Sequence, residues 1–239
     1  MHMRKKADIQ GLLRTLRAFY KQGARAHLPW RATRDPYKVL VSEVMLQQTQ
    51  VGRVVPFYNR FIKKFPTARA LAKATLSKVL QEWQGLGYNR RGKYLWEAAK
   101  IISKEGWSGK LPGVGPYTKA AVEAFAHNKP TVFVETNIRT VFFHHCGFLQ
   151  KDKISDAELL PMVAEALKQS RMQPRDFYAA LMDYGTHLKR QGVKLNSKSK
   201  HYAKQSKFEG SARQKRAKKL RALLARGASE KELEKLLNS

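Results

Sequence analysis

Cysteine is almost absent from this chain, which has Cys146 alone among 239 residues. A single thiol excludes an internal disulfide and any cluster that four thiolates must hold. No run of about 18 apolar residues occurs, so the sequence predicts no membrane-spanning helix. The first residues also lack the apolar segment of a secretory signal. These absences favour a reducing compartment, and we expect a cytoplasmic location.

Acidic residues are scarce as well. The chain has 18 Asp and Glu against 47 Lys and Arg, which gives a formal net charge of +29 and a pI of about 10.4. Such an excess indicates a polyanionic partner, with nucleic acid ahead of an acidic membrane surface. A merely soluble basic surface is the weaker interpretation.

Apolar residues recur at helical spacing over nearly the whole chain, which predicts an all-α fold. Glu43 lies in an expected helix that runs to about Val51. Ser155 and Glu158 form a capping box for another helix. Only residues 130–134 look briefly extended. Further helices are expected over residues 9–20, 54–65, 68–73, 76–84, 90–104, 118–126, 156–169 and 177–188.

The character of the chain changes near its C-terminus. Residues 189–239 contain 16 Lys and Arg but only 4 Asp and Glu. One helix is expected over about residues 211–226. A second is expected after Ser229, which forms a capping box with Glu232. Residues 192–210 are expected to be a basic, loosely structured wrap, and a disordered tail is an equal alternative on composition.

Residues 42–49 (S-E-V-M-L-Q-Q-T) place one carboxylate and two amides in an otherwise apolar helical run. Apolar residues one turn away should remove solvent from Glu43 and raise the pKa of its carboxyl. A glutamate with a raised pKa can deliver a proton as a general acid near neutral pH. The alternative for a lone glutamate is a surface position on an amphipathic helix.

A second motif, L-P-G-V-G-P-Y-T at residues 111–118, opens directly onto an expected helix. Gly113 and Gly115 on either side of Val114 permit a tight turn whose amides can approach a phosphate. Thr118 and Lys119 follow in the first turn of the helix. In so basic a chain this reads as a helix-hairpin-helix grip on DNA, whereas an ordinary helix connection is the alternative.

Three neighbouring residues could suggest a metal site: His144, His145 and Cys146. No further ligand is near them in the sequence, and adjacent histidines diverge on a helix. We therefore expect core or surface roles for them and no metal.

Four motifs stand in the order and approximate spacing of the helix-hairpin-helix base-excision glycosylases. Within that group the chain most resembles the MutY-type adenine glycosylases, over about residues 28–184. The resemblance implies a two-lobed helical fold and a DNA repair enzyme associated with the nucleoid. The matching motifs are residues 42–49, 85–88, 111–118 and 134–137.

The same resemblance implies how the chain is divided. One helical lobe would combine residues 1–30 with 127–191. A six-helix-type lobe would hold the hairpin within residues 31–126. The basic extension would then cover residues 192–239.

Residue roles can be carried over from the resemblance. Glu43 matches the acid that protonates the adenine ring and helps to activate water. Gln47 and Gln48 match amides that probe the space left by the flipped base. Tyr88 matches an aromatic wedge that enters the base stack, although a core aromatic is the alternative.

Further matches concern DNA contacts and the reaction type. Arg90 and Arg91, after the wedge, are expected to bind DNA. Trp30 and Arg31 match residues that line the adenine pocket. Tyr117 stands where bifunctional relatives carry a Schiff-base lysine, and a phenol cannot form an imine. The resemblance therefore implies a monofunctional glycosylase.

Glu135 departs from the family pattern, which usually has an aspartate that stabilises the cationic sugar. The charge is kept, but one more methylene moves the carboxylate by roughly 1.5 Å. A misplacement of that size can cost on the order of 10²-fold in rate. The alternative is that Glu135 only caps the helix that contains Asn137.

Two larger departures concern recognition and cofactors. The four-cysteine iron–sulfur motif of the family is missing, and residues 194–213 could replace it. We also expect the C-terminal domain that helps to recognise 8-oxoguanine to be absent. We expect no required cofactor, although a monovalent cation could sit on the hairpin carbonyls near Val114. The expected partner is double-stranded DNA with a mispaired or damaged base, bound by a monomer.

Three hypotheses follow from the sequence. The first is a glycosylase that removes adenine mispaired with guanine or 8-oxoguanine. The second is a mismatch thymine or uracil glycosylase, or a weak bifunctional lyase. The third is a non-catalytic protein that binds mismatched or abasic DNA. We expect the first.

Overall fold

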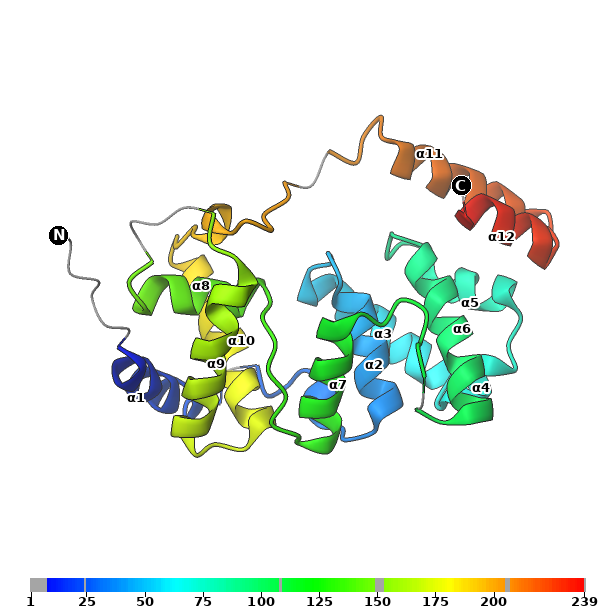
Figure 1. Ribbon diagram of the computed structural model, residues 1–239. Coiled ribbons are helices and arrows are strands. Elements are labelled where there is room, and N and C mark those ends of the chain that lie inside the picture. The colour runs from blue at the N-terminus through cyan, green and yellow to red at the C-terminus, as the bar shows by residue number, and fades with distance from the viewer. Residues whose placement is uncertain (1–7, 24, 108, 149–152, 205–206, 239) are drawn as a thin grey trace. The chain divides into compact units, whose positions relative to one another are not determined.

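The computed structural model describes residues 8–23, 25–107, 109–148, 153–204 and 207–238 (Figure 1). These residues form α-helices and two short 3-10 helices, and no β-strand lies within them. The all-α prediction is confirmed. Residues 130–134, which looked extended in the sequence, form no strand. Nothing among the described helices has the length and apolar character needed to cross a bilayer.

The chain divides into two compact units. The first unit contains residues 1–31 and 119–204, and the second contains residues 32–118 and 205–239. Helix α7 (Pro116–His127) passes from the second unit into the first. The basic extension contributes its beginning to the first unit and its two helices to the second.

The first unit is built around α10, which packs against α8 and α1 (Figure 1). The crossing of α10 and α8 is close, because a Cβ added at Gly185 would lie 2.5 Å from the carbonyl oxygen of Asn137. The expected capping box of Ser155 and Glu158 starts α9. The elements of this unit are α1 (Ile9–Tyr20), η1 (Pro29–Arg31), α8 (Thr136–His145), α9 (Asp156–Ser170), α10 (Pro174–Arg190) and η2 (Asn196–Lys198).

Residues 196–200 are ordered against the first unit. Ile154 donates its backbone N–H to Lys198 at 2.8 Å and accepts from the N–H of Lys200 at 2.8 Å, which makes an isolated bridge with Ser199. The hydroxyl of Thr140 bonds the Asn196 side chain at 3.2 Å. The disordered-tail alternative is therefore wrong for residues 196–200, while residues 205 and 206 lie outside the described part.

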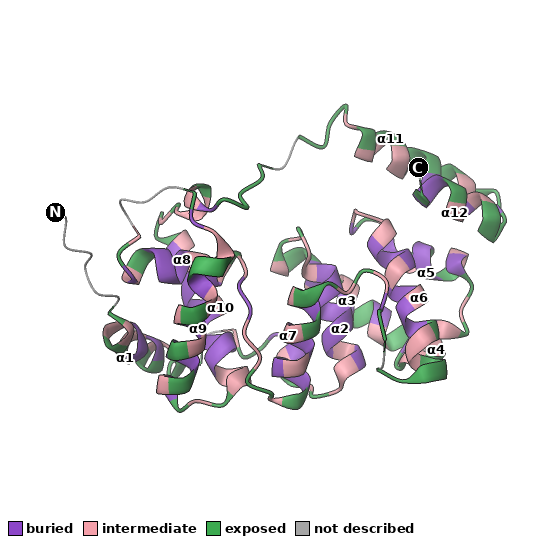
Figure 2. Cartoon of the chain, in the orientation of Figure 1, coloured by how far each residue is buried: buried purple, intermediate pink, exposed green. Residues whose placement is uncertain are grey.

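The second unit buries α2 at its centre, and Figure 2 shows this helix lined with buried residues. Trp83 and Phe61 are fully buried and meet edge to face. Helix α4 packs against α6 along its length. The helices of this unit are α2 (Pro36–Leu46), α3 (Val51–Lys64), α4 (Ala68–Ala72), α5 (Leu76–Trp83), α6 (Arg90–Glu105), α11 (Ala212–Ala225) and α12 (Glu230–Asn238).

One helix boundary differs from the sequence prediction. Helix α2 ends at Leu46 rather than near Val51, and α3 begins as a separate helix at Val51. Between them Gln48 adopts a left-handed conformation with φ +55°. This conformation is uncommon for a residue with a Cβ. Because the turn contains no glycine or proline, nothing in the sequence indicated that the helix ends there.

Candidate active site and DNA-binding elements

Helix α2 carries Glu43 into the core of the second unit. Asp35 caps the helix by accepting the N–H of Tyr37 at 2.9 Å, and Pro36 occupies the first helical position. The Glu43 side chain is then held where the residue is only 6% exposed. The alternative of a surface glutamate is therefore wrong.

Tyr117 is the hydrogen-bond partner of this carboxylate. It lies in the first turn of α7, and its phenol donates to Oε2 of Glu43 at 2.9 Å. A donor on one oxygen helps to fix the orientation of the carboxylate. Tyr117, which stands where bifunctional relatives carry a lysine, thus contacts the candidate acid Glu43.

Gln47 and Thr118 make a second link between the end of α2 and α7. The Gln47 amide donates to the Thr118 hydroxyl at 3.4 Å. Thr118 is 2% exposed, so its side chain faces the protein and not DNA. The expected role of its side chain in DNA binding is corrected accordingly.

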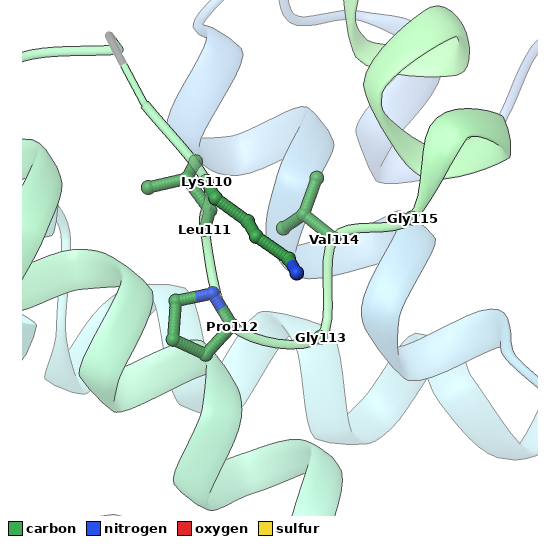
Figure 3. A pocket seen from close by; sticks show the side chains of 6 residues that line it. All are labelled: Lys110, Leu111, Pro112, Gly113, Val114 and Gly115. Atoms are coloured by element: carbon green, nitrogen blue, oxygen red, sulfur yellow. The ribbon is translucent and has the colours of Figure 1, made fainter.

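The hairpin that precedes α7 forms an open hollow of about 470 Å³, lined by residues 110–115 (Figure 3). Leu111 accepts the N–H of Val114 at 3.1 Å, which closes the turn. Gly113 has φ +71°, and a Cβ there would lie 2.8 Å from Cβ of Tyr94. The turn therefore requires glycine at 113, whereas a Cβ at Gly115 would meet nothing within 4 Å.

Charged side chains border this hairpin. Figure 3 shows the Lys110 side chain lying across the turn, with its ammonium beside the stretch from Gly113 to Gly115. Lys119 follows on α7 and is exposed. Exposed glycine amides beside lysine charges suit a phosphate.

The loop between α5 and α6 presents Tyr88 in a strained conformation. Tyr88 has φ +49°, and the neighbouring Gly85 and Gly87 have φ +93° and +83°. The indole of Trp83 donates to the Gly87 carbonyl at 3.1 Å and braces the loop. Tyr88 is half-buried at the surface of the second unit. It is therefore not a core aromatic residue, which was the alternative.

Arg91 is buried, contrary to its expected role as a DNA contact. Its guanidinium donates to the carbonyls of Val44 and Met45 at 2.9 Å each, and to Gly87 and the Thr49 hydroxyl at 3.1 Å. Burial lowers the pKa of Arg91 to about 10, so the group stays charged at neutral pH. Arg91 thus caps the end of α2 and joins it to the loop that contains Gly87 and Tyr88.

Arg90 is likewise committed within the protein. It is the first residue of α6, and its Nε donates to the Leu237 carbonyl near the end of α12. This contact fits a positive charge at a helix C-terminus. Arg90 therefore anchors the end of α12, and its expected DNA contact stays a prediction.

Trp30 and Arg31 belong to the first unit and lie in η1. Trp30 is 9% exposed. Arg31 pairs with Asp183 at 3.0 Å, and Arg25 binds the same carboxylate. The Arg31 guanidinium also lies 5.7 Å from the Phe125 ring centroid. The ion pair fixes the Arg31 side chain in place.

Glu135, also in the first unit, is the N-cap of α8. Its Oε1 accepts the N–H groups of Asn137 and Ile138 at 2.7 and 2.9 Å. Its Oε2 accepts from Thr136 at 3.0 Å. The structure thus shows that Glu135 caps α8, and the cap holds its carboxylate in one fixed orientation.

The described part of the chain offers no donor set for a metal ion. Among the described residues, no three His, Cys, Asp or Glu side chains gather as metal ligands. An iron–sulfur cluster with four thiolates does not fit, because Cys146 is the only cysteine. Cys146 is buried, which raises the pKa of its thiol to about 12. His145 instead bonds the Tyr184 hydroxyl at 2.9 Å.

The sequence of this chain matches that of a known protein family. Residues 41–163, just over half of the chain, match the family described as HhH-GPD superfamily base excision DNA repair protein. The chain belongs to this family. The match begins two residues before Glu43 and includes Tyr88, the hairpin and Glu135.

Individual members of the HhH-GPD superfamily are similar to most of the chain. The adenine DNA glycosylase of Mycolicibacterium smegmatis is 40% identical over 172 residues, which cover 68% of this chain and 58% of that protein. The adenine DNA glycosylase of Buchnera aphidicola subsp. Baizongia pistaciae is 34% identical over 181 residues, with 72% and 51% covered. The chain thus spans little more than half the length of these relatives.

A solved HhH-GPD structure agrees with the fold. A thermostable thymine-DNA glycosylase superimposes with a TM-score of 0.61 and 28% identity, covering 74% of this chain and 85% of that one. The sequence motifs located the family, but they did not reveal the contact between Tyr117 and Glu43. These two residues are 74 positions apart, and no local pattern records such a pairing.

Proposed function

We propose that this chain is a monofunctional DNA glycosylase that removes adenine mispaired with guanine or 8-oxoguanine. The observation that carries the proposal is the buried Glu43 carboxyl with Tyr117 bonded to it at 2.9 Å. A carboxyl buried in an apolar helix suits a general acid, and the bonded phenol orients it. Adenine glycosylases among the relatives support adenine as the base.

The reaction would begin with a flipped adenine, whose extrusion costs a few kcal/mol. Glu43 gives its proton to N7 of the base, and the C1′–N9 bond then breaks with its electron pair going to adenine. The sugar is left as an oxocarbenium-like cation. Water adds at C1′ and loses its proton to the Glu43 carboxylate, which restores the acid.

Glu135 would supply negative charge to stabilise the cationic sugar. The hydrogen bonds from the α8 N-terminus support this role, because they hold the carboxylate in one orientation. Glu135→Asp keeps the charge and a good capping residue, whereas Glu135→Ala removes both. We expect base release to persist in the first variant and to fall by more than about tenfold in the second.

Tyr117 supports the monofunctional assignment. A lyase of this superfamily type needs an amine that forms an imine with the sugar, and a phenol cannot do so. Borohydride should therefore trap no protein–DNA adduct. Any adduct trapped in the wild type would overturn the assignment. Its loss in Lys119→Gln, which removes the lysine two residues after Tyr117, would identify the amine.

The substrate is tested by single-turnover base release from duplexes with adenine opposite 8-oxoguanine, adenine opposite guanine, and thymine opposite guanine. Adenine release alone supports the proposal. Thymine release would favour the second candidate, a mismatch thymine glycosylase, which the 28% identical thymine-DNA glycosylase supports. Tight binding without release of any base would leave a non-catalytic binder of damaged DNA.

A further inference from the structure

The two C-terminal helices form a small hairpin of their own. Helices α11 and α12 pack together, orange and red in Figure 1. Their contact is apolar: Leu220 and Leu224 on α11 are buried, as are Leu233, Leu236 and Leu237 on α12. Burying several leucines gives this hairpin a defined structure despite its high charge.

Polar contacts attach the hairpin to α5 and α6 at both ends of α12. The Glu230 carboxylate accepts the backbone N–H of Leu76, the first residue of α5, at 2.9 Å. At the other end, Arg90 donates to the Leu237 carbonyl. A carboxylate at a helix N-terminus and a cation at a helix C-terminus are both favourable. The hairpin is thus fixed beside the loop that joins α5 and α6.

This placement brings Arg213, near the start of α11, onto Tyr88. The guanidinium donates to the Tyr88 hydroxyl at 2.7 Å, and its carbon lies 5.2 Å from the ring centroid. Arg91 lies 5.3 Å from the same centroid. The ring of the strained Tyr88 therefore lies beside two cations, Arg91 from α6 and Arg213 from α11.

The outer side of α11 carries uncompensated positive charge. Helix α11 has six lysines and arginines and no acidic residue of its own. The exposed basic residues of the helix are Lys215, Lys218, Lys219 and Arg221. Such a row repels itself in the free protein and is complementary to a phosphate backbone.

We propose that α11–α12 is a DNA-binding element that grips duplex phosphates beside the loop that contains Gly87 and Tyr88, and that Arg213 positions Tyr88 for entry into the base stack. The proposal rests on the proposed function, because it takes Tyr88 as the inserted residue. Lys215, Lys218, Lys219 and Arg221 supply the phosphate contacts. Arg213 fixes the phenol before binding, so that less ordering remains to be done on the DNA.

The phosphate contacts are tested by the salt dependence of binding. The variant K215Q/K218Q/K219Q/R221Q is compared with K63Q/K64Q/R69Q/K73Q, which removes the same charge from α3 and α4. Binding to a mismatched duplex is measured between about 50 and about 200 mM salt. The first variant should reduce the slope of log K against log salt by about 2 or more. Equal slopes for the two variants would overturn the proposal.

The action of Arg213 through Tyr88 is tested by a double-mutant cycle. We expect R213M and Y88F each to slow base release by about tenfold, and R213M to add little in the Y88F background. A 2-aminopurine next to the target should report slower unstacking in R213M. Independent, multiplying effects, or an unchanged rate in R213M, would contradict the positioning role.

Failure of the two proposals can be told apart. The salt slope and the 2-aminopurine signal are measured without any base release. If the wild type releases no base but the variants change the salt slope and the 2-aminopurine signal as expected, the glycosylase assignment is overturned. The DNA contacts of α11–α12 would then still stand. A wild type that releases adenine while both variants behave as controls would overturn the hairpin proposal alone. Far-UV CD confirms that each variant is folded.

Discussion

Tyr117 donates its phenolic proton to Glu43 at 2.9 Å, which joins the first turn of α7 to the buried helix α2. The Tyr117 phenol therefore does more than replace the lysine of bifunctional relatives. It orients the candidate acid, and as a donor to a carboxylate it favours the ionised form.

Replacing Tyr117 by Phe should therefore change the pH dependence of the reaction. Without the donor, Glu43 holds its proton more readily, so the limb on which the rate falls with rising pH should move to higher pH. The maximal rate should fall by about tenfold, because the carboxyl loses its fixed orientation. Single-turnover rates across pH measure both effects. A lower rate with an unshifted profile would mean that the contact is only structural.

Arg91 should be important for stability rather than for phosphate binding. Arg91→Met leaves several buried carbonyls without a donor, and we expect the free energy of unfolding to fall by about 3 kcal/mol. Arg90→Met, on the same helix end, should cost only about 1 kcal/mol. Urea unfolding compares the two variants. Equal free energies of unfolding for the two variants, with a weaker salt dependence of DNA binding in R91M, would show that Arg91 contacts DNA instead.

The two hairpin glycines should differ in their tolerance of alanine. Gly113→Ala meets both a positive φ and a close Tyr94, so it should lower stability by about 1–2 kcal/mol. Gly115→Ala has space for the new methyl group and should be nearly neutral. Thermal unfolding of the two variants tests this. Similar melting temperatures would show that the turn can rearrange.

His145 predicts a loss of stability in acid. Burial, with some contribution from neighbouring His144, lowers the pKa of His145 below its ordinary 6.5. The unfolded chain then binds a proton at a higher pH than the folded chain, so stability falls as pH drops below about 6.5. His145→Gln should lose less stability than the wild type between about pH 7.5 and about pH 5.5. His27→Gln, at an exposed position, is the control and should resemble the wild type.

The sequence revealed much of this account because its strongest signals are local. Helical periodicity predicted the all-α fold, and the capping box at Ser155 marked a helix start that the structure confirms. The end of α2 was missed because Gln48 takes a left-handed turn without a glycine. The burial of Arg91 was missed because a charged residue in a basic chain suggests phosphate binding, and its carbonyl partners are about 45 residues away.

Long-range contacts were beyond the reach of sequence patterns. Arg213 and Tyr88 are 125 positions apart, and nothing near either residue indicates the other. The basic composition of the extension was visible, but its attachment to α5 and α6 depends on Glu230 and Leu237 meeting partners far along the chain. Such pairings are set by tertiary packing, which local propensity does not encode.

The most direct test of the account compares wild type with Glu43→Gln in single-turnover adenine release from a duplex with adenine opposite 8-oxoguanine. Glutamine keeps the size of the side chain but cannot deliver the proton. We expect release by the wild type, a loss of at least about 10³-fold in the variant, and unchanged DNA binding. Release by E43Q at a rate near that of the wild type would contradict the assignment of Glu43 as the general acid.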